Sequence, residues 1–312
     1  MRTAAATVGA ASNPHPWGPI IVNRSASPDP RHLKVVAFNA RSGRAIDKML
    51  QRLKRPPLNH PQIILLSEMD WHVRRSGWRE TAAELAAALD MSFAYIGEFG
   101  ISRRSGPPVS FIGNAILSAW PLADVRVLPL SRALLRSRDH RLVGAPAGLT
   151  GTIVVNRRTI VLGVAHLNSR WDPAGRDLQM SQFLRQMPPG IPAIIGGDFN
   201  TTTVSLSHPV SFIPVMGLMA LWPARFRHPQ KWEPLFHRLR EAGFDTTGAN
   251  VRGAPTFTPS RLVPPFIRPK LDWLALRGLK PIAGSALVVP ARSSALGRRF
   301  SDHDFIMCEV EV

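Results

Sequence analysis

The side chains best suited to chemistry follow short apolar segments that are typical of buried strands. Four such segments end at polar or charged residues: residues 35–38 at Asn39, residues 63–67 at Glu68, residues 163–165 at His166 and Asn168, and residues 193–197 at Asp198 and Asn200. Two later segments have the reverse order, with Asp272 at the start of 271–276 and with Asp302 and His303 directly before 304–312. If all these side chains meet on one rim, the last two strands must run antiparallel to the first four.

The chemical types in this set point to a hard divalent cation. Glu68, Asp198 and Asp302 are carboxylates, and Asn39 and Asn200 add neutral oxygens. Such a set suits Mg²⁺ or Mn²⁺, whereas a zinc site would use more His or Cys. The two histidines supply general acid–base function and stabilise negative charge that develops on a phosphoryl group. With a cation that polarises a phosphoryl oxygen, the set predicts a hydrolytic phosphoester site.

Each residue also has a simpler structural interpretation when it is taken alone. Glu68 could be a surface carboxylate at a strand end, His166 a satisfied core histidine, and residues 302–303 a turn cap. The run of residues 196–200, Gly-Gly-Asp-Phe-Asn, is more demanding, because paired glycines allow close backbone approach. The presence of all these residues in this order favours a functional site over a structural one.

The composition limits the class of protein. With 312 residues, 45% of them hydrophobic, the chain can bury a large core. No apolar run reaches the roughly 18 residues of a transmembrane helix. Residues 1–32 lack the compact apolar core of a secretory signal, so we expect a disordered leader there, with a degenerate targeting segment as the alternative. The single cysteine, Cys308, excludes an internal disulfide and fits a cytoplasmic setting.

The charge is strongly basic. Lys and Arg number 39 against 21 Asp and Glu, which gives a net charge of +18. Such a field attracts polyanions, either nucleic acid or an anionic membrane face. An Arg, Pro and Ala bias of the genome is the alternative explanation, because no charge pattern selects one face of the protein.

The remaining pattern predicts an α/β domain. Apolar strands alternate with a hairpin over 151–165 and with helical patterns at 44–54, 78–90, 173–187 and 232–242, which indicates layers with mixed sheets. Residues 205–230 do not fit this rhythm, because they are apolar, aromatic and punctuated by prolines. Such an insertion is typical of a lid or a binding loop and is too apolar for disorder.

The motifs together resemble the endonuclease/exonuclease/phosphatase superfamily, which has the fold of pancreatic deoxyribonuclease. The resemblance is carried by Phe38-Asn39, Ser67-Glu68, residues 113–118 (Gly-Asn-Ala-Ile-Leu-Ser), His166-Leu167, residues 197–200, Leu271-Asp272-Trp273 and Ser301-Asp302-His303. It implies a four-layered α/β sandwich in which two packed mixed β-sheets are flanked by helices. It also implies a single catalytic domain over residues 33–312.

The resemblance implies roles for the individual residues. Glu68 would be the principal metal ligand, aided by Asn39 and Asp302. His303, held by Asp272, would activate or orient the attacking water, and Asp198 would position or deprotonate it. Asn200 would orient Asp198 and the phosphate, and His166 would stabilise negative charge on a non-bridging oxygen.

Three further positions are weaker candidates for binding substrate. The resemblance places Asn114 near the phosphate, in the Gly-Asn-Ala-Ile pattern. Arg170 and Arg176 follow His166, on a loop and on the next predicted helix. Arg170 could reach a substrate phosphate, although a solvated arginine is an equal alternative.

The substrate class stays open at this level, because family substrates differ in the loops around a shared rim. The basic charge favours a nucleic-acid phosphodiesterase, either endonuclease or exonuclease. The apolar 205–230 insertion suits base stacking, but it also suits peripheral contact with a membrane and hence a phospholipid or sphingomyelin-type phosphodiesterase. A small phosphate-ester hydrolase and a non-enzymatic nucleic-acid-binding module are also compatible with the sequence.

Overall fold

Two β-sheets form the centre of the computed structural model, which describes residues 17–101, 109–131, 142–205, 212–260, 262–293 and 297–312. The strand order of the first sheet is β1 (Ile20–Val22), β4 (Ser92–Ile101), β5 (Phe111–Ser118), β3 (Ile63–Trp71), β2 (His32–Asn39), β13 (Phe305–Glu311) and β12 (Leu287–Val289), with β7 (Leu142–Gly144) paired to β4. The order of the second sheet is β11 (Asp272–Arg277), β10 (Ala193–Asp198), β9 (Arg158–Val164), β8 (Ala147–Val155) and β6 (Ala123–Pro129). Both sheets are mixed, since β2 pairs in parallel with β3 and β9 with β10.

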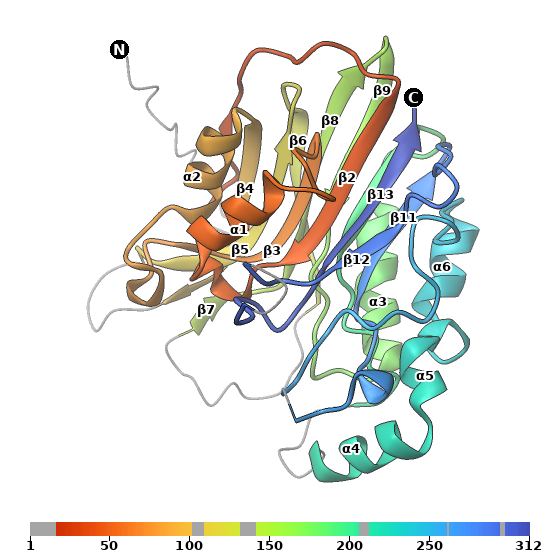
Figure 1. The fold of residues 1–312 in the computed structure, drawn as a ribbon. Helices are drawn as coiled ribbons and strands as arrows, with labels where there is room; N and C mark the ends of the chain where they lie inside the picture. Colours follow the sequence, from red (N-terminus) through yellow and green to blue (C-terminus); the bar gives the residue numbers. More distant parts are fainter. Residues whose placement is uncertain (1–16, 102–108, 132–141, 206–211, 261, 294–296) are drawn as a thin grey trace.

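Helices cover the outer face of each sheet (Figure 1). On the first sheet lie α1 (Ile46–Leu53) and α2 (Thr81–Leu89), and on the second lie α3 (Pro173–Arg185) and α6 (Leu235–Glu241). Further along the second sheet's side are α4 (Phe212–Leu221) and α5 (Pro223–Arg227). Short 3-10 turns form at Arg41–Gly43, Arg74–Ser76, Pro229–Lys231 and Pro265–Ile267. The expected four-layered α/β sandwich is therefore confirmed.

Three apolar layers hold this architecture together. Between the sheets, Leu65 of β3 and Leu162 of β9 belong to one fully buried cluster. Outside the first sheet, Leu85 of α2 packs in a second cluster, and outside the second sheet Phe183 of α3 packs in a third. Residues 63–66 of β3 and residues 193–195 of β10 are buried on both faces of their sheets, which accounts for the continuously apolar segments that the sequence shows there.

Local signals in the sequence set the ends of the elements beside the site. Helix α3 begins with Pro173 in its first turn, and the Asp172 carboxylate accepts a hydrogen bond from the Gly175 amide at 2.8 Å. The β8–β9 hairpin turns at Asn156 and Arg157, whose φ angles of 49° and 60° suit a tight two-residue turn. This turn lies at the end of β9 opposite to His166.

The strand directions agree with the rim that the sequence predicts. β11 runs antiparallel to β10, with Asp198 opposite Asp272, and β13 runs antiparallel to β2. The last two strands therefore begin at the edge where the first four end. Side chains that are far apart in the sequence are brought to one rim by this arrangement.

Two expectations about irregular segments were wrong. Ile20–Val22, within the expected leader, forms β1 and pairs with Phe93, Ala94 and Tyr95 of β4, because the edge of the first sheet offers it backbone partners. Residues 212–227, within the expected irregular insertion, form the helices α4 and α5. Residues 1–16 of the leader and 206–211 of the insertion lie outside the described residues.

Candidate active site

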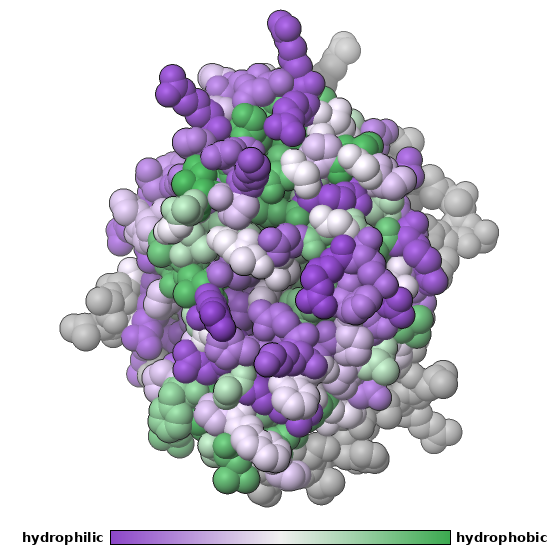
Figure 2. All heavy atoms as spheres, turned by 90° about the vertical axis from the view of Figure 1, so that its right-hand side faces the viewer, coloured by the Kyte–Doolittle hydropathy of each residue, from purple (hydrophilic) through white to green (hydrophobic). Residues whose placement is uncertain are grey.

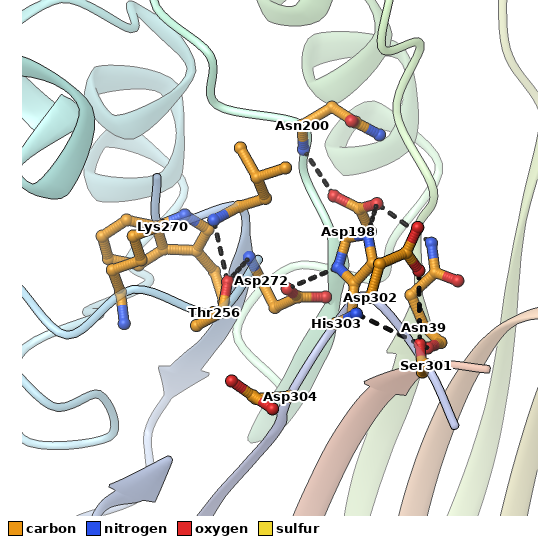
Figure 3. Close-up of polar contacts among 12 residues, drawn as sticks. Asn39, Asp198, Asn200, Thr256, Lys270, Asp272, Ser301, Asp302, His303 and Asp304 are labelled. Carbon is orange, nitrogen blue, oxygen red and sulfur yellow. Dashed lines mark hydrogen bonds and ion pairs between the residues drawn. The ribbon is translucent and has the colours of Figure 1, made fainter. Parts of the chain in front are cut away.

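The predicted catalytic and metal-binding residues meet at the rim where the two sheets adjoin (Figure 3). Asn39 ends β2, Glu68 lies in β3, and Asp198 ends β10. His166 follows β9, Asp272 begins β11, and residues 302–303 precede β13. The Asn39 amide donates to Glu68 Oε1 at 3.0 Å and to Asp198 Oδ2 at 3.1 Å, so it joins groups from both sheets.

Glu68 reaches the rim through an irregularity in its strand. The register between β3 and β5 shifts between Leu66 and Met69, and Glu68 has a φ angle of 55°, which is rare for a side chain with a Cβ. A bulge of this kind turns one side chain out of the regular alternation. Burial alone would raise the pKa of Glu68, but His166, the Asn39 amide and His303 lower it below its ordinary value. Glu68 is thereby held as a carboxylate.

Asp198 is fixed by the glycine before it and the asparagine after it. A Cβ on Gly197, whose φ is +135°, would lie 2.3 Å from the Ala165 carbonyl oxygen, so only glycine allows this approach. The Asn200 amide N–H donates to Asp198 Oδ1 at 2.9 Å, and the Asn200 side chain donates to the Leu167 carbonyl at 2.8 Å. Burial raises the pKa of Asp198 to about 6, against the lowering effect of the neighbouring histidines.

His303 and Asp272 form a buried pair. His303 Nδ1 lies 2.8 Å from Asp272 Oδ2, and His303 Nε2 lies 3.6 Å from Asp198 Oδ2. Although burial alone would lower the pKa of His303, the carboxylates of Asp272 and Asp198 raise it to about 10. The imidazole therefore carries a positive charge at neutral pH and directs its Nε2–H toward Asp198.

Residues outside the predicted catalytic set also hold this pair. Thr256 Oγ1 accepts from the Leu271 and Asp272 amides at 2.9 and 3.0 Å, and Ser301 Oγ accepts from the His303 amide at 3.1 Å. The Phe257 ring packs on the His303 ring with centroids 4.8 Å apart. Thr256 and Phe257 come from a loop whose composition gave no signal of a role at the site.

His166 stands among three carboxylates. Its Nε2 lies 3.8 Å from Asp198 Oδ2 and 4.0 Å from Glu68 Oε1, and its Nδ1 lies 3.9 Å from Glu98 Oε2. Burial alone would lower the pKa of His166, but these carboxylates raise it above its ordinary value. Glu98, which sequence reasoning missed, is buried in β4, where burial raises its pKa to about 7. Its one signal was an acid inside the apolar run of residues 93–101.

The arrangement fits a divalent cation. Glu68 and Asp302 line one cavity, and their side chains are 30% and 28% exposed, so hard oxygen donors are available there. Asp302 Oδ2 lies 3.5 Å from Nε of Arg41, whose side chain is 59% exposed. Asp198, Asp272 and His303 form a second grouping, whose ligand atoms lie within 4.8 Å of one another. We favour the first grouping, because Asp272 is buried and its Oδ2 is already bonded to His303.

Asn39 differs from a simple metal ligand in this arrangement. Its amide nitrogen faces Glu68 and Asp198, and its Oδ1 accepts from the Arg41 amide at 3.0 Å. These bonds position the two carboxylates. Coordination of the metal by Asn39 stays a prediction.

The three weaker candidates do not line the cavity. Asn114 is fully buried and donates to the Ala147 carbonyl at 2.9 Å. Arg176 is fully buried in an ion pair with Glu233, with Nη2 2.5 Å from Oε1. Arg170 lies on the exposed loop before α3. Arg176 therefore has a structural partner, which accounts for its position without a substrate.

The cavity at the rim has a volume of about 300 Å³, and its lining is partly polar and partly apolar. The polar lining residues are Glu68, His166, Ser169, Asp198, Asn200, Thr202, Asp302 and His303. The apolar lining residues, from α4, α5 and the loops, are Val215, Met216, Met219, Phe226, Phe257, Pro259, Pro269 and Leu271. Among the described residues that line it, none is Lys or Arg.

A two-sheet α/β sandwich with clustered carboxylates and histidines at the shared rim defines a class of metal-dependent hydrolases. The model of the Endonuclease/Exonuclease/phosphatase family matches residues 36–303, and the chain belongs to this family. It is thus a metal-dependent phosphoester hydrolase with a deoxyribonuclease-I-like fold. No curated protein matches the chain.

Solved structures with this fold are similar over most of the chain. An endonuclease/exonuclease/phosphatase from Beutenbergia cavernae has a TM-score of 0.62 and 18% identity, with coverage of 91% of this chain and 72% of that one. D. rerio TDP2 complexed with single-strand DNA product has a TM-score of 0.55 and 14% identity, with coverage of 91% of this chain and 100% of that one. Sphingomyelinase C from Streptomyces griseocarneus has a TM-score of 0.51 and 15% identity, with coverage of 89% of this chain and 99% of that one. At these identities the likeness shows the fold.

Proposed function

We propose that the chain is a Mg²⁺-dependent phosphodiesterase that hydrolyses an amphiphilic phosphodiester of the phospholipid or sphingomyelin type. The observation that carries this proposal is that half of the described lining of the catalytic cavity is apolar, beside the catalytic groups. Nucleic acid presents further phosphates on both sides of the scissile one, and proteins bind these with Lys and Arg. The described lining of the cavity offers none, whereas it suits an apolar group next to a single phosphate.

We infer that Asp198 is the base. His303 is already protonated at neutral pH, because Asp272 and Asp198 raise its pKa to about 10, so it cannot accept a proton from water. Asp198 has a pKa of about 6 and is ionised at neutral pH, and it lies between the two histidines. We infer that Asp198 takes the proton of the attacking water while the water oxygen forms a bond to phosphorus. The ester bond opposite this oxygen then breaks, and the leaving alkoxide takes a proton from solvent and departs as the alcohol.

The two histidines would stabilise negative charge on the phosphoryl group. His166 Nε2 and His303 Nε2 both face Asp198 Oδ2, at 3.8 and 3.6 Å, so a phosphoryl group beside Asp198 lies within reach of both. They stabilise the negative charge that develops on the non-bridging oxygens. Asn200 keeps Asp198 oriented through its backbone N–H.

Glu68 and Asp302 would hold the cation, with Asn39 as the predicted third ligand. When bound, Mg²⁺ polarises a phosphoryl oxygen and neutralises developing charge. Mn²⁺ has the same preference for oxygen ligands and is expected to substitute for it. The hard donors support these ions over zinc.

A nucleic-acid phosphodiesterase is the second candidate. It is supported by the net charge of +18, and the similar D. rerio protein was solved with a single-strand DNA product. In the described part of the chain, no helix is long and apolar enough to cross a membrane. The cytoplasmic setting inferred from the single cysteine stays a prediction.

Parallel assays with Mg²⁺ distinguish the candidates. We expect hydrolysis of sphingomyelin or phosphatidylcholine vesicles and of bis-p-nitrophenyl phosphate, and a loss of about 100-fold or more in Asp198→Asn. Asp245→Asn, at an exposed carboxylate remote from the rim, is the matched control. Efficient cleavage of single- or double-stranded DNA or of RNA, with vesicles left intact, would replace our proposal with the second candidate.

A further inference from the structure

A second large cavity in the described part of the chain is separate from the catalytic one. It has a volume of about 890 Å³ and is lined by Trp222, α5, the turn Pro229–Lys231, the loop of residues 246–253, and Lys270 and Trp273. Its basic lining residues are Arg225, His228, Lys231, Arg252 and Lys270, and none of the described lining residues is Asp or Glu. A hollow in which every charged side chain is basic has the chemistry of an anion site.

The basic side chains of this cavity lie close to one another. Lys270 is 1% exposed, and its Nζ donates to the Val251 carbonyl at 3.3 Å and lies 4.6 Å from the centre of the Trp273 ring. The pKa of His228 is lowered by burial and by Arg252 and other neighbouring cations. An anion in the cavity would therefore relieve repulsion among groups that the fold already holds together.

The cavity is tied to the catalytic turn. Arg225 lies over the Trp232 ring at 4.7 Å, and its guanidinium donates to Thr203 Oγ1 at 3.1 Å and to the Thr203 carbonyl at 2.9 Å. Thr203 follows Asn200 in the same turn. Lys270 lies two residues before Asp272. The Asp272 side chain is hydrogen-bonded to His303, whereas the Lys270 side chain points away from His303 (Figure 3). The two cavities share no described lining residue, but they lie beside the same segments: Arg225 lines the basic cavity and Phe226 the catalytic one.

An exposed apolar patch adjoins both cavities. Trp222 lines the basic cavity and is 63% exposed, and Leu221 before it is 78% exposed. On the 3-10 turn packed against α5, Phe266 is 60% exposed, and Leu262 nearby is 92% exposed. Figure 2 shows apolar surface at the lower end of this face, where Figure 1 places α4, below a largely hydrophilic surface. Such a patch beside cations has the composition of a surface that meets lipid headgroups and acyl chains together.

We propose that the basic cavity binds the phosphate of an anionic lipid headgroup and so docks the enzyme on an anionic membrane beside its catalytic cleft. The proposal rests on the proposed function, because it explains how an amphiphilic substrate reaches that cleft. Leu221 and Trp222 would enter the interface, while Lys231 and Arg252 hold the headgroup phosphate at the cavity mouth. Lys and Arg near an anionic leaflet each strengthen binding about fivefold.

The test is sedimentation with vesicles, made without Mg²⁺ so that no turnover occurs. Wild-type protein is compared with Lys231→Gln/Arg252→Gln and with Arg157→Gln/Arg158→Gln, which removes the same charge at the β8–β9 turn. All four side chains are exposed, so folding should be kept. On vesicles of phosphatidylcholine with phosphatidylglycerol, we expect the cavity variant to bind about 25-fold more weakly and the control to bind like wild type.

Equal losses in both variants, or no loss in the cavity variant, would overturn the proposal. A soluble source of the same anion is distinguished by inorganic phosphate and glycerol phosphate: if either binds the wild-type cavity while vesicles do not, the site serves a free phosphate compound. A single-stranded oligonucleotide that binds in place of vesicles would overturn the membrane occupant. Hydrolysis of bis-p-nitrophenyl phosphate with Mg²⁺ should be unchanged in both variants, which separates failure of docking from failure of the proposed function.

Discussion

Arg176 of α3 and Glu233 form an ion pair in which both side chains are fully buried beneath the catalytic turn. The Glu233 carboxylate also accepts a hydrogen bond from the Thr203 amide at 2.7 Å, and Arg176 donates to the Trp171 carbonyl. The pair therefore fastens the turn that follows Asn200 to the helix that follows His166. Burial raises the pKa of Glu233 above its ordinary value, although Arg176 opposes the shift.

Arg176→Met should destabilise the fold by about 3–5 kcal/mol, because it leaves the Glu233 carboxylate buried without its cation. The free energy of unfolding in urea measures the effect, with Arg185→Met on the exposed face of the same helix as the control. Arg176→Met/Glu233→Leu should recover much of the loss. If Arg176→Met instead kept wild-type stability and raised KM alone, Arg176 would be a substrate ligand after all.

Asp272→Asn should lower kcat by about 10²–10⁴-fold while it leaves KM nearly unchanged. The reason is that Asp272 Oδ2 holds His303 Nδ1 at 2.8 Å and keeps the imidazole charged and aimed at Asp198. Initial rates with bis-p-nitrophenyl phosphate give both parameters. A variant that retained more than about a tenth of wild-type kcat would show that the pair only supports the fold.

Metal affinity separates the two groupings of ligands at the rim. We expect Glu68→Gln and Asp302→Asn each to weaken Mn²⁺ binding by about tenfold or more, and Asp272→Asn to change it little. Isothermal titration or the Mn²⁺ electron paramagnetic resonance signal measures the affinity without turnover. A loss in Asp272→Asn as large as that in Glu68→Gln would place the ion in the cluster of Asp198, Asp272 and His303.

The parts of the site that could be predicted are those written locally in the sequence. Asn39, Asp198 and Asp272 lie at strand ends, and the apolar segments beside them show both the strand and its end. The directions of the strands followed from one requirement, that these side chains meet at one rim. The antiparallel pairing of β10 and β11, with Asp198 opposite Asp272, agrees with this requirement. The apolar 193–197 segment needed no tertiary information to be identified as a buried strand.

The parts that could not be predicted depend on contacts that are distant in the sequence. Glu98 faces His166 across 68 positions, and nothing near either residue shows that they meet. Arg176 follows His166 on the next predicted helix, which made it a weaker candidate for binding substrate, yet its partner comes from position 233. Ile20–Val22 is a strand only because β4 leaves an open edge for it. In each case the position of the residue depends on the free energy of burial against a partner that is distant in the sequence. Local secondary-structure propensity does not include this contribution.

The rate should depend on pH through Asp198 and His303. As a base, Asp198 must be ionised, so with its pKa raised to about 6 the rate should fall as the pH drops below 6. His303 must stay protonated, and its pKa of about 10 predicts a second fall only in alkali. The profile of kcat/KM between pH 4.5 and 10.5 tests this, and a rate that is unchanged at pH 4.5 contradicts the role of Asp198. Asp245→Asn should show the wild-type profile.

Glu98 should make the folded state less stable as the pH rises. Burial raises its pKa from the ordinary 4.5 to about 7, so between these values the unfolded chain releases a proton that the folded chain keeps. The contribution of Glu98 is therefore full below pH 4.5 and is lost as the pH rises through 7, by on the order of 3 kcal/mol.

Urea unfolding of wild type and Glu98→Gln at pH 5 and pH 8 isolates this contribution. Glutamine can still accept the Ala147 amide N–H, which lies 2.9 Å from Glu98 Oε1, but it does not titrate. Glu98→Gln should thus lose less stability than wild type between the two pH values, and Glu84→Gln on the partly exposed face of α2 should lose as much as wild type. Equal pH dependence in wild type and Glu98→Gln would mean that Glu98 is already ionised at pH 5, held so by His166.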